Sequence, residues 1–119
     1  MTIEKNQRFP KMDRSLALLG MAKKAGKLAV GGDAASTAAR RGEAVLIITA
    51  SDASEGSIRR AKSNAESNEV EYIAVPFTMF ELGTTAGRGS PGTIAFLDKG
   101  LAEGFKNKLN ESEKKEGDA

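Results

Sequence analysis

The chain has 119 residues, 39% of them hydrophobic and 29% charged, which is typical of one globular domain with a sizeable core. It contains no Cys and no His, which excludes disulfides, thiolate zinc sites, cysteine nucleophiles and histidine bases. No apolar run approaches the roughly 20 residues that span a bilayer, and the polar N-terminus lacks a signal-peptide core. We therefore expect a cytoplasmic protein with no membrane partner.

Hydrophobic periodicity and turn residues predict alternating helices and strands. The predicted strands are short and apolar, and they cover residues 27–30, 44–50, 72–75 and 93–97. The predicted helices cover residues 14–25, 34–41, 55–66, 79–82 and 99–109. The strand at 44–50 is apolar throughout, and the one at 72–75 is also expected to be buried, which is typical of strands covered on both faces.

Polar residues at turns mark the starts of the predicted helices. Asp13 and Ser54 are expected N-caps, and the cap of the second helix is Gly32 or Asp33. Thr78 and Glu81 have the spacing of a capping box. Two further acids, Asp52 and Asp98, each follow a strand, and we interpret them as turn and cap residues rather than as a metal or acid–base pair.

This alternation predicts an α/β fold, namely a three-layer α/β/α sandwich around a small, about four-stranded mixed sheet that is mostly parallel. The small face of Ala34, Ala35, Ala38 and Ala39 favours close packing of the second helix on that sheet. The expected organisation is a flexible N-terminal arm (1–12), a single α/β/α domain (13–109) and a charged flexible tail (110–119).

Positive charge is concentrated in the first third of the chain, although the net charge is only +2. Residues 1–42 hold nine Lys or Arg against three acids, whereas residues 43–97 hold four against seven. The asymmetry predicts a surface for a polyanion, with a solvated basic face as the alternative.

Two glycine-rich segments are the candidate site, one at 31–33 and an irregular loop predicted at 83–92. If both lie at one rim of the sheet, they form a cleft between a helix start and a loop that carries Arg88. Neither segment matches a nucleotide phosphate loop or a dinucleotide fingerprint. The aromatic residues are expected mostly in the core, so docking onto a shaped RNA backbone is favoured over base stacking on exposed rings.

Five segments, read in order, resemble a known family. They are LLGMAKKAGKLAVG (18–31), the G-x(10)-G helix from Gly31 to Gly42, AVLIITASDAS (44–54), ELGTTAGR (81–88) and IAFLDKGLAEGF (94–105). Together they are similar to the kink-turn-binding ribosomal proteins of the L-seven-Ae and L-thirty-e family, and most similar to its small bacterial branch, the YlxQ-type ribosomal-like proteins.

The resemblance implies an L-thirty-e-like sandwich that binds structured RNA such as a kink-turn, without catalysis, cofactor or metal. In the family, polar residues at the start of the second helix contact sheared G·A pairs, and the loop after the Leu-Gly element covers a flipped-out base. Taken with the residue patterns, this gives the candidate RNA-binding residues Lys27, Gly31, Gly32, Asp33, Ser36, Thr37, Arg40, Arg41, Gly87 and Arg88.

The chain departs from the family pattern at the start of the second helix. Asp33 stands where Asn is expected, Ala34 replaces Glu, and Thr37 replaces Lys. Each lost contact costs about 1–3 kcal/mol by analogy with base readout.

Three functions stay open at this point. The first is a monomeric, ribosomal or ribosome-associated RNA-binding protein, with structured or ribosomal RNA as its partner. The second is a protein-interaction or regulatory module on the same fold with a decayed RNA site. The third, an enzyme or small-molecule binder, rests only on the glycine-rich cleft.

Overall fold

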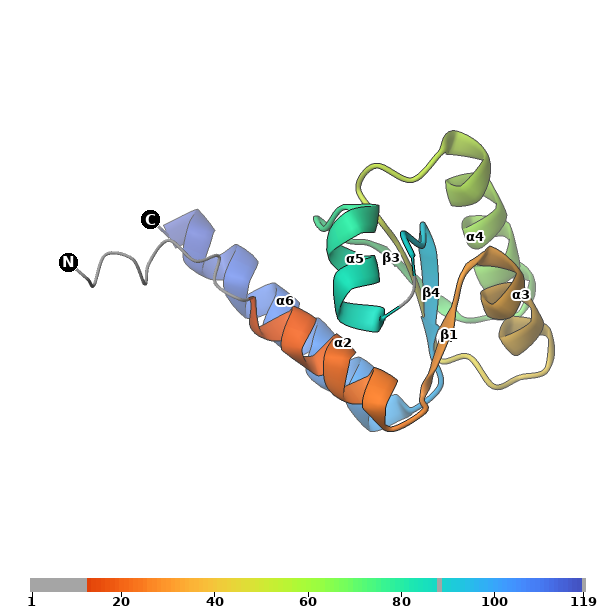
Figure 1. Ribbon diagram of the computed structural model, residues 1–119, viewed down its shortest axis with the longest axis horizontal. Helices are drawn as coiled ribbons and strands as arrows, with labels where there is room; N and C mark the ends of the chain where they lie inside the picture. Colours follow the sequence, from red (N-terminus) through yellow and green to blue (C-terminus); the bar gives the residue numbers. More distant parts are fainter. Residues whose placement is uncertain (1–12, 88, 119) are drawn as a thin grey trace.

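The computed structural model describes residues 13–87 and 89–118, in which four strands and five helices alternate (Figure 1). The elements are α2 (Arg14–Lys24), β1 (Leu28–Val30), α3 (Gly32–Arg40), β2 (Leu46–Thr49), α4 (Glu55–Ser67), β3 (Glu71–Ala74), α5 (Met79–Ala86), β4 (Thr93–Phe96) and α6 (Lys99–Asp118). The predicted arm at residues 1–12 lies outside the described residues, and α6 extends past Leu109, where the sequence places its end.

The four strands form one mixed sheet in the order β1-β4-β2-β3. The prediction of a mostly parallel sheet is wrong, because β4 inserts between β1 and β2 and pairs antiparallel with both. Only β2 and β3 pair in parallel, with Leu46 opposite Glu71. β2 is buried along its whole length, as predicted, whereas β3 is an edge strand with exposed residues at both ends. The expectation that β3 is buried is therefore also wrong.

Helices cover both faces of the sheet, which confirms the three-layer sandwich (Figure 1). On one face, Leu46 and Ile48 of β2 join the buried residues of α2, α5 and α6. On the other face, Ile47 packs with an alanine-rich cluster from α3 and α4. The alternation follows from the two-residue period of a strand. Ala35, Ala38 and Ala39 lie in this cluster as predicted, but Ala34 is exposed at the start of α3.

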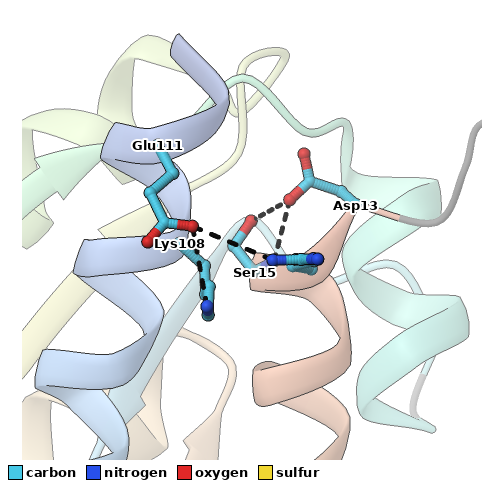
Figure 2. Close-up of polar contacts among 5 residues, drawn as sticks. Asp13, Ser15, Lys108 and Glu111 are labelled. Carbon is cyan, nitrogen blue, oxygen red and sulfur yellow. Dashed lines mark hydrogen bonds and ion pairs between the residues drawn. The ribbon is translucent and has the colours of Figure 1, made fainter. Parts of the chain in front are cut away.

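Side-chain caps fix most of the helix starts where the sequence predicts them. Ser54 Oγ accepts the Ser57 N–H at 3.1 Å, and Thr78 and Glu81 form the complete capping box. Asp13 caps α2 through the backbone and hydroxyl of Ser15. Figure 2 shows this cap beside α6, whose Glu111 lies 4.0 Å from Arg14 and 3.5 Å from Lys108. The start of α2 therefore lies beside the middle of α6.

Within the described residues, none of the helices combines the length and the apolar character needed to cross a membrane.

Candidate nucleic-acid interface

Three helices begin at the same rim of the sheet. β1, β2 and β3 run in one direction, because β4 is antiparallel to both β1 and β2 and β3 is parallel to β2. Each of these strands leads into a helix, so α3, α4 and α5 all start at the carboxyl ends of the strands (Figure 1). β4 begins there too, and the Gly31 N–H donates to the Thr93 carbonyl at 2.8 Å. We call residues 31–33, 50–54, 75–79 and 89–93 the helix-start rim.

The start of α3 differs from the other two helix starts on this rim. Its N-cap is Gly31, not Gly32 or Asp33 as predicted, and no side-chain cap is present among the described residues. Gly31 has φ +105° and ψ 157°, a conformation that residues with a Cβ rarely adopt. The first-turn N–H groups of α3 therefore face the rim without a side-chain acceptor. They carry the positive end of the helix dipole, which favours a bound anion.

Polar side chains join this start of α3 to α4. Arg60 Nη2 donates to Asp33 Oδ1 at 2.8 Å, although the Asp33 side chain is 95% exposed and that of Arg60 is 52% exposed. One turn further, Asn64 Nδ2 donates to the buried Ser36 Oγ at 2.6 Å. Gly32 also lies beside Arg60, because a Cβ added there would lie 3.4 Å from the guanidinium.

The cavity between these two helices has a volume of only about 30 Å³ and is lined by residues that include Gly32, Ser36, Arg60, Asn64 and Thr93. This volume holds about one water molecule. A nucleotide does not fit inside it, so a ligand at this rim must lie across a surface. The sequence analysis missed Arg60 and Asn64 as site residues. Their spacing of four on α4 places both on one face, but only the fold brings that face against the start of α3.

The other residues predicted on β1 and α3 lie away from this rim. Lys27 precedes β1, and its carbonyl accepts the Leu97 N–H at 2.8 Å beyond the end of β4. Arg40 and Arg41 lie at the end of α3, where Arg40 makes a long 3.4 Å contact with Thr37 Oγ1. The structure therefore groups Gly31, Gly32, Asp33 and Ser36 at one rim. It places the three cations at the opposite rim, with Thr37 between the two groups.

The predicted irregular loop at 83–92 is wrong in its first half. Residues 83–86 belong to α5, which ends at Gly87 with φ +76°. A Cβ on Gly87 would lie 3.7 Å from Nζ of Lys23, so this glycine lies beside α2 rather than beside α3. Arg88 lies outside the described residues. From Gly89 the chain folds back along α5, where a Cβ on Gly83 would lie 1.8 Å from the Gly89 carbonyl oxygen.

The two acids considered as a metal or acid–base pair are a turn and a cap residue, as interpreted from the sequence, although the bond of Asp52 to the start of α5 was not predicted. Asp52 Oδ1 accepts the Met79 N–H at 2.8 Å, and Asp98 Oδ2 accepts the Leu101 N–H at 2.9 Å. Within the part of the chain that the structure describes, no three His, Cys, Asp or Glu residues are grouped so that they could hold a metal ion.

Among the aromatic rings that the structure describes, the expected burial holds for all but one, and Phe9 lies outside the described residues. Phe77, Phe96 and Phe105 are buried, and Tyr72 is half-buried with its hydroxyl 2.6 Å from Thr49 Oγ1. Phe80 in the first turn of α5 is instead 73% exposed. The aromatic residues are thus mostly in the core, as predicted, but an exposed ring is present.

The fold is a three-layer α/β/α sandwich with a mixed four-stranded sheet and three helix starts at one rim. Residues 13–104 match the model of the ribosomal protein L7Ae/L30e/S12e/Gadd45 family. Because this match covers more than half of the chain, the protein belongs to that family.

Solved structures share the fold. A protein of unknown function from Bacillus halodurans C is similar with a TM-score of 0.75 and 23% identity, over 82% of this chain and 98% of that one. The Giardia lamblia 15.5kD RNA binding protein is similar with a TM-score of 0.64 and 19% identity, over 82% of this chain and 83% of that one. Among the curated proteins, none matches the sequence.

Proposed function

We propose that this protein binds structured RNA, such as a kink-turn, through the helix-start rim and the segment that precedes β4. The observation that carries the proposal is the start of α3, which lacks a side-chain cap on a rim shared by two more helix starts. Backbone N–H groups at such a start are suited to phosphates and to base edges that accept hydrogen bonds. Membership of a family that includes ribosomal proteins supports this, as does the fold shared with the Giardia RNA binding protein.

The candidate residues take different roles in this proposal. Gly31 and Gly32 let the RNA approach the backbone closely, and Asp33 accepts hydrogen bonds from guanine amino groups. Ser36 holds α4 in place through Asn64. Arg60 supplies a cation beside Asp33. This cation offsets the loss of the lysine that the family pattern has at the position of Thr37. Gly87 and Arg88 form the second contact segment.

The cations at the opposite rim act differently. Lys27, Arg40 and Arg41 lie too far from Gly31 to touch the same nucleotide, because the nine residues of α3 span about 13 Å. They contact phosphates of a longer RNA. We further propose a bacterial ribosome-associated role in translation, in the cytoplasm, as a monomer without catalysis or cofactor.

The test is a titration of the full chain against a kink-turn RNA, a straight duplex and ribosomal RNA at two salt concentrations. Arg60→Ala and Arg88→Ala are expected to weaken binding to the kinked RNA, and binding should fall steeply with salt because counterions are released. Arg59→Ala is the matched control, since Arg59 is the adjacent exposed arginine of α4. Preference for ribosomal RNA alone would point to a different structured element. Binding no stronger than to the duplex would contradict the proposal.

A specific observation favours the alternative of a protein-interaction module with a decayed RNA site. The exposed Asp33 carboxylate puts negative charge where an RNA phosphate would bind, and Ala34 beside it offers no polar group. If no RNA binds above the duplex level at moderate salt, this alternative becomes the better account.

A further inference from the structure

Phe80 is the most exposed large apolar side chain in the part of the chain that the structure describes. The residue is 73% exposed, and the next is Met21 of α2 at 55%. The helical period explains why Phe80 does not pack in the core. At about 100° per residue, Leu82 and Ala86 share the buried face of α5, and Phe80 lies on the opposite side. Folding therefore leaves the ring in water.

The backbone that carries this ring is firmly held. The capping box of Thr78 and Glu81 closes the first turn of α5, with the Thr78 N–H donating to Glu81 Oε1 at 2.9 Å. The neighbouring Met79 N–H donates to Asp52 Oδ1 of the β2–α4 turn at 2.8 Å. An aromatic side chain has few rotatable bonds, so a ring on such a fixed backbone loses little entropy on contact.

The backbone of Phe80 directly follows the helix-start rim, in the first turn of α5. The Gly31 N–H at the start of α3 bonds to Thr93, and a Cβ on the adjacent Gly92 would lie 3.6 Å from the sulfur of Met79. Met79 directly precedes Phe80. An RNA that crosses the rim from the start of α3 over Gly92 therefore reaches the first turn of α5, which carries the ring.

The charges around the ring select which part of an RNA can lie on it. Asp52 and Glu81, both exposed, flank this turn, and their carboxylates repel phosphates. The face of a nucleobase carries no net charge, and it stacks on aromatic rings with little dependence on sequence. We propose that Phe80 is a stacking platform for an unpaired nucleobase of the bound RNA. This inference rests on the proposed function, and Phe80 is not among the residues that the family resemblance assigns to RNA contact.

The chain contains no Trp, which allows a direct test with one introduced fluorophore. The Phe80→Trp variant of the full chain is titrated with the kink-turn RNA and with the same RNA whose unpaired nucleotides are replaced by an abasic linker. We expect stacking to quench the emission with the intact RNA and much less with the abasic one. Met21→Trp is the matched control, because it puts the fluorophore at the other exposed apolar position, and its emission should stay unchanged.

Affinity gives a second readout that does not depend on fluorescence. Phe80→Ala is expected to weaken binding roughly 5- to 100-fold, the usual range for losing one stacked base, whereas Phe80→Tyr should retain it. Because the side chain is exposed, neither change should unfold the protein, and Met21→Ala should leave affinity unchanged. If the kink-turn RNA binds but Phe80→Ala binds equally well and Phe80→Trp is not quenched, the inference is overturned while the proposed function stands. If no RNA binds above the duplex level, both fail.

Discussion

Asp33 places an exposed carboxylate at the start of α3, and this charge opposes an approaching phosphate. We expect Asp33→Asn to strengthen kink-turn RNA binding about 10-fold, because the amide adds a donor, removes the negative charge and frees Arg60. The free energy of unfolding should change by less than about 0.5 kcal/mol, since an exposed ion pair contributes little. Titration of both proteins at one salt concentration measures the effect.

Glu43→Gln is the matched control for this change. Glu43 is exposed after the end of α3, at the opposite rim, so the substitution changes the net charge equally. An equal gain in affinity for both variants would mean that only the overall charge matters, and would contradict a role for Asp33 at the site.

Gly83 is the position where a single methyl group would disturb the segment before β4. A Cβ there would lie 1.8 Å from the Gly89 carbonyl oxygen, so the backbone must shift. We expect Gly83→Ala to lower the free energy of unfolding by about 1–3 kcal/mol, as overpacking does. Urea denaturation measures this change. Gly56→Ala in α4 is the control, because nothing lies within 4 Å of the added Cβ, and it should stabilise the protein slightly.

Single residues could be predicted from the sequence where the interaction is local. Thr78 with Glu81 and Asp98 with Leu101 act within three residues, and both caps are found as expected. The role of Arg60 could not be predicted in the same way, because its partner Asp33 is 27 residues away on another helix. The exposure of Phe80 depends on which face of α5 meets the core. The helix predicted from the sequence covered only residues 79–82, whereas α5 continues to Ala86.

At the level of secondary-structure elements, Lys106 joins α6 to the edge strand β3. Its ammonium lies 2.6 Å from Glu71 Oε1 and 3.3 Å from Glu103 Oε2. The hydrogen bond to Glu71, with a further one to Glu103, raises the pKa of Lys106 above its usual 10.5. Because the folded protein holds this proton more tightly, the stabilisation is fully present below pH 10.5. It is lost as the pH rises through the raised pKa.

We therefore expect Lys106→Gln to be less stable than the parent chain at pH 8, by at most about 1 kcal/mol, because Glu71 is half exposed. The difference should narrow as the pH rises above 10.5. Urea denaturation of both proteins across this range measures it. Lys24→Gln, which removes an exposed cation of α2, controls for net charge. A difference that stays constant up to pH 12 would contradict the linkage.

Elements were predicted better than their arrangement. Each strand was predicted to within two residues at either end, because apolar runs and glycine or proline stops are local signals. The direction of β4 and its place between β1 and β2 depend on packing between distant segments. The end of α5 was misplaced because Gly83 was read as the start of a glycine-rich loop. Gly83 instead lies within α5, where the absence of a side chain lets the Gly89 carbonyl approach closely.

At the scale of the whole molecule, the candidate cations at the two rims should respond to different lengths of RNA. A short kink-turn RNA covers the helix-start rim, whereas one with an extended stem can also reach the end of α3. Arg41 is exposed there and contributes one positive charge. We expect Arg41→Ala to leave binding of the short RNA unchanged. With the extended RNA, it should lower the slope of log affinity against log salt by about one.

Arg60→Ala is the counterpart at the helix-start rim, and it should weaken binding of both RNAs. Affinities measured at four salt concentrations for both variants separate the two effects, because a phosphate contact changes the slope. If Arg41→Ala weakened binding of the short RNA as much as Arg60→Ala does, the short RNA would contact the end of α3. The helix-start rim would then not be the main interface. We expect Arg60→Ala to lower the affinity for both RNAs and Arg41→Ala to lower it only for the extended one. That pattern would mean that the RNA crosses the molecule from the start of α3 to its end.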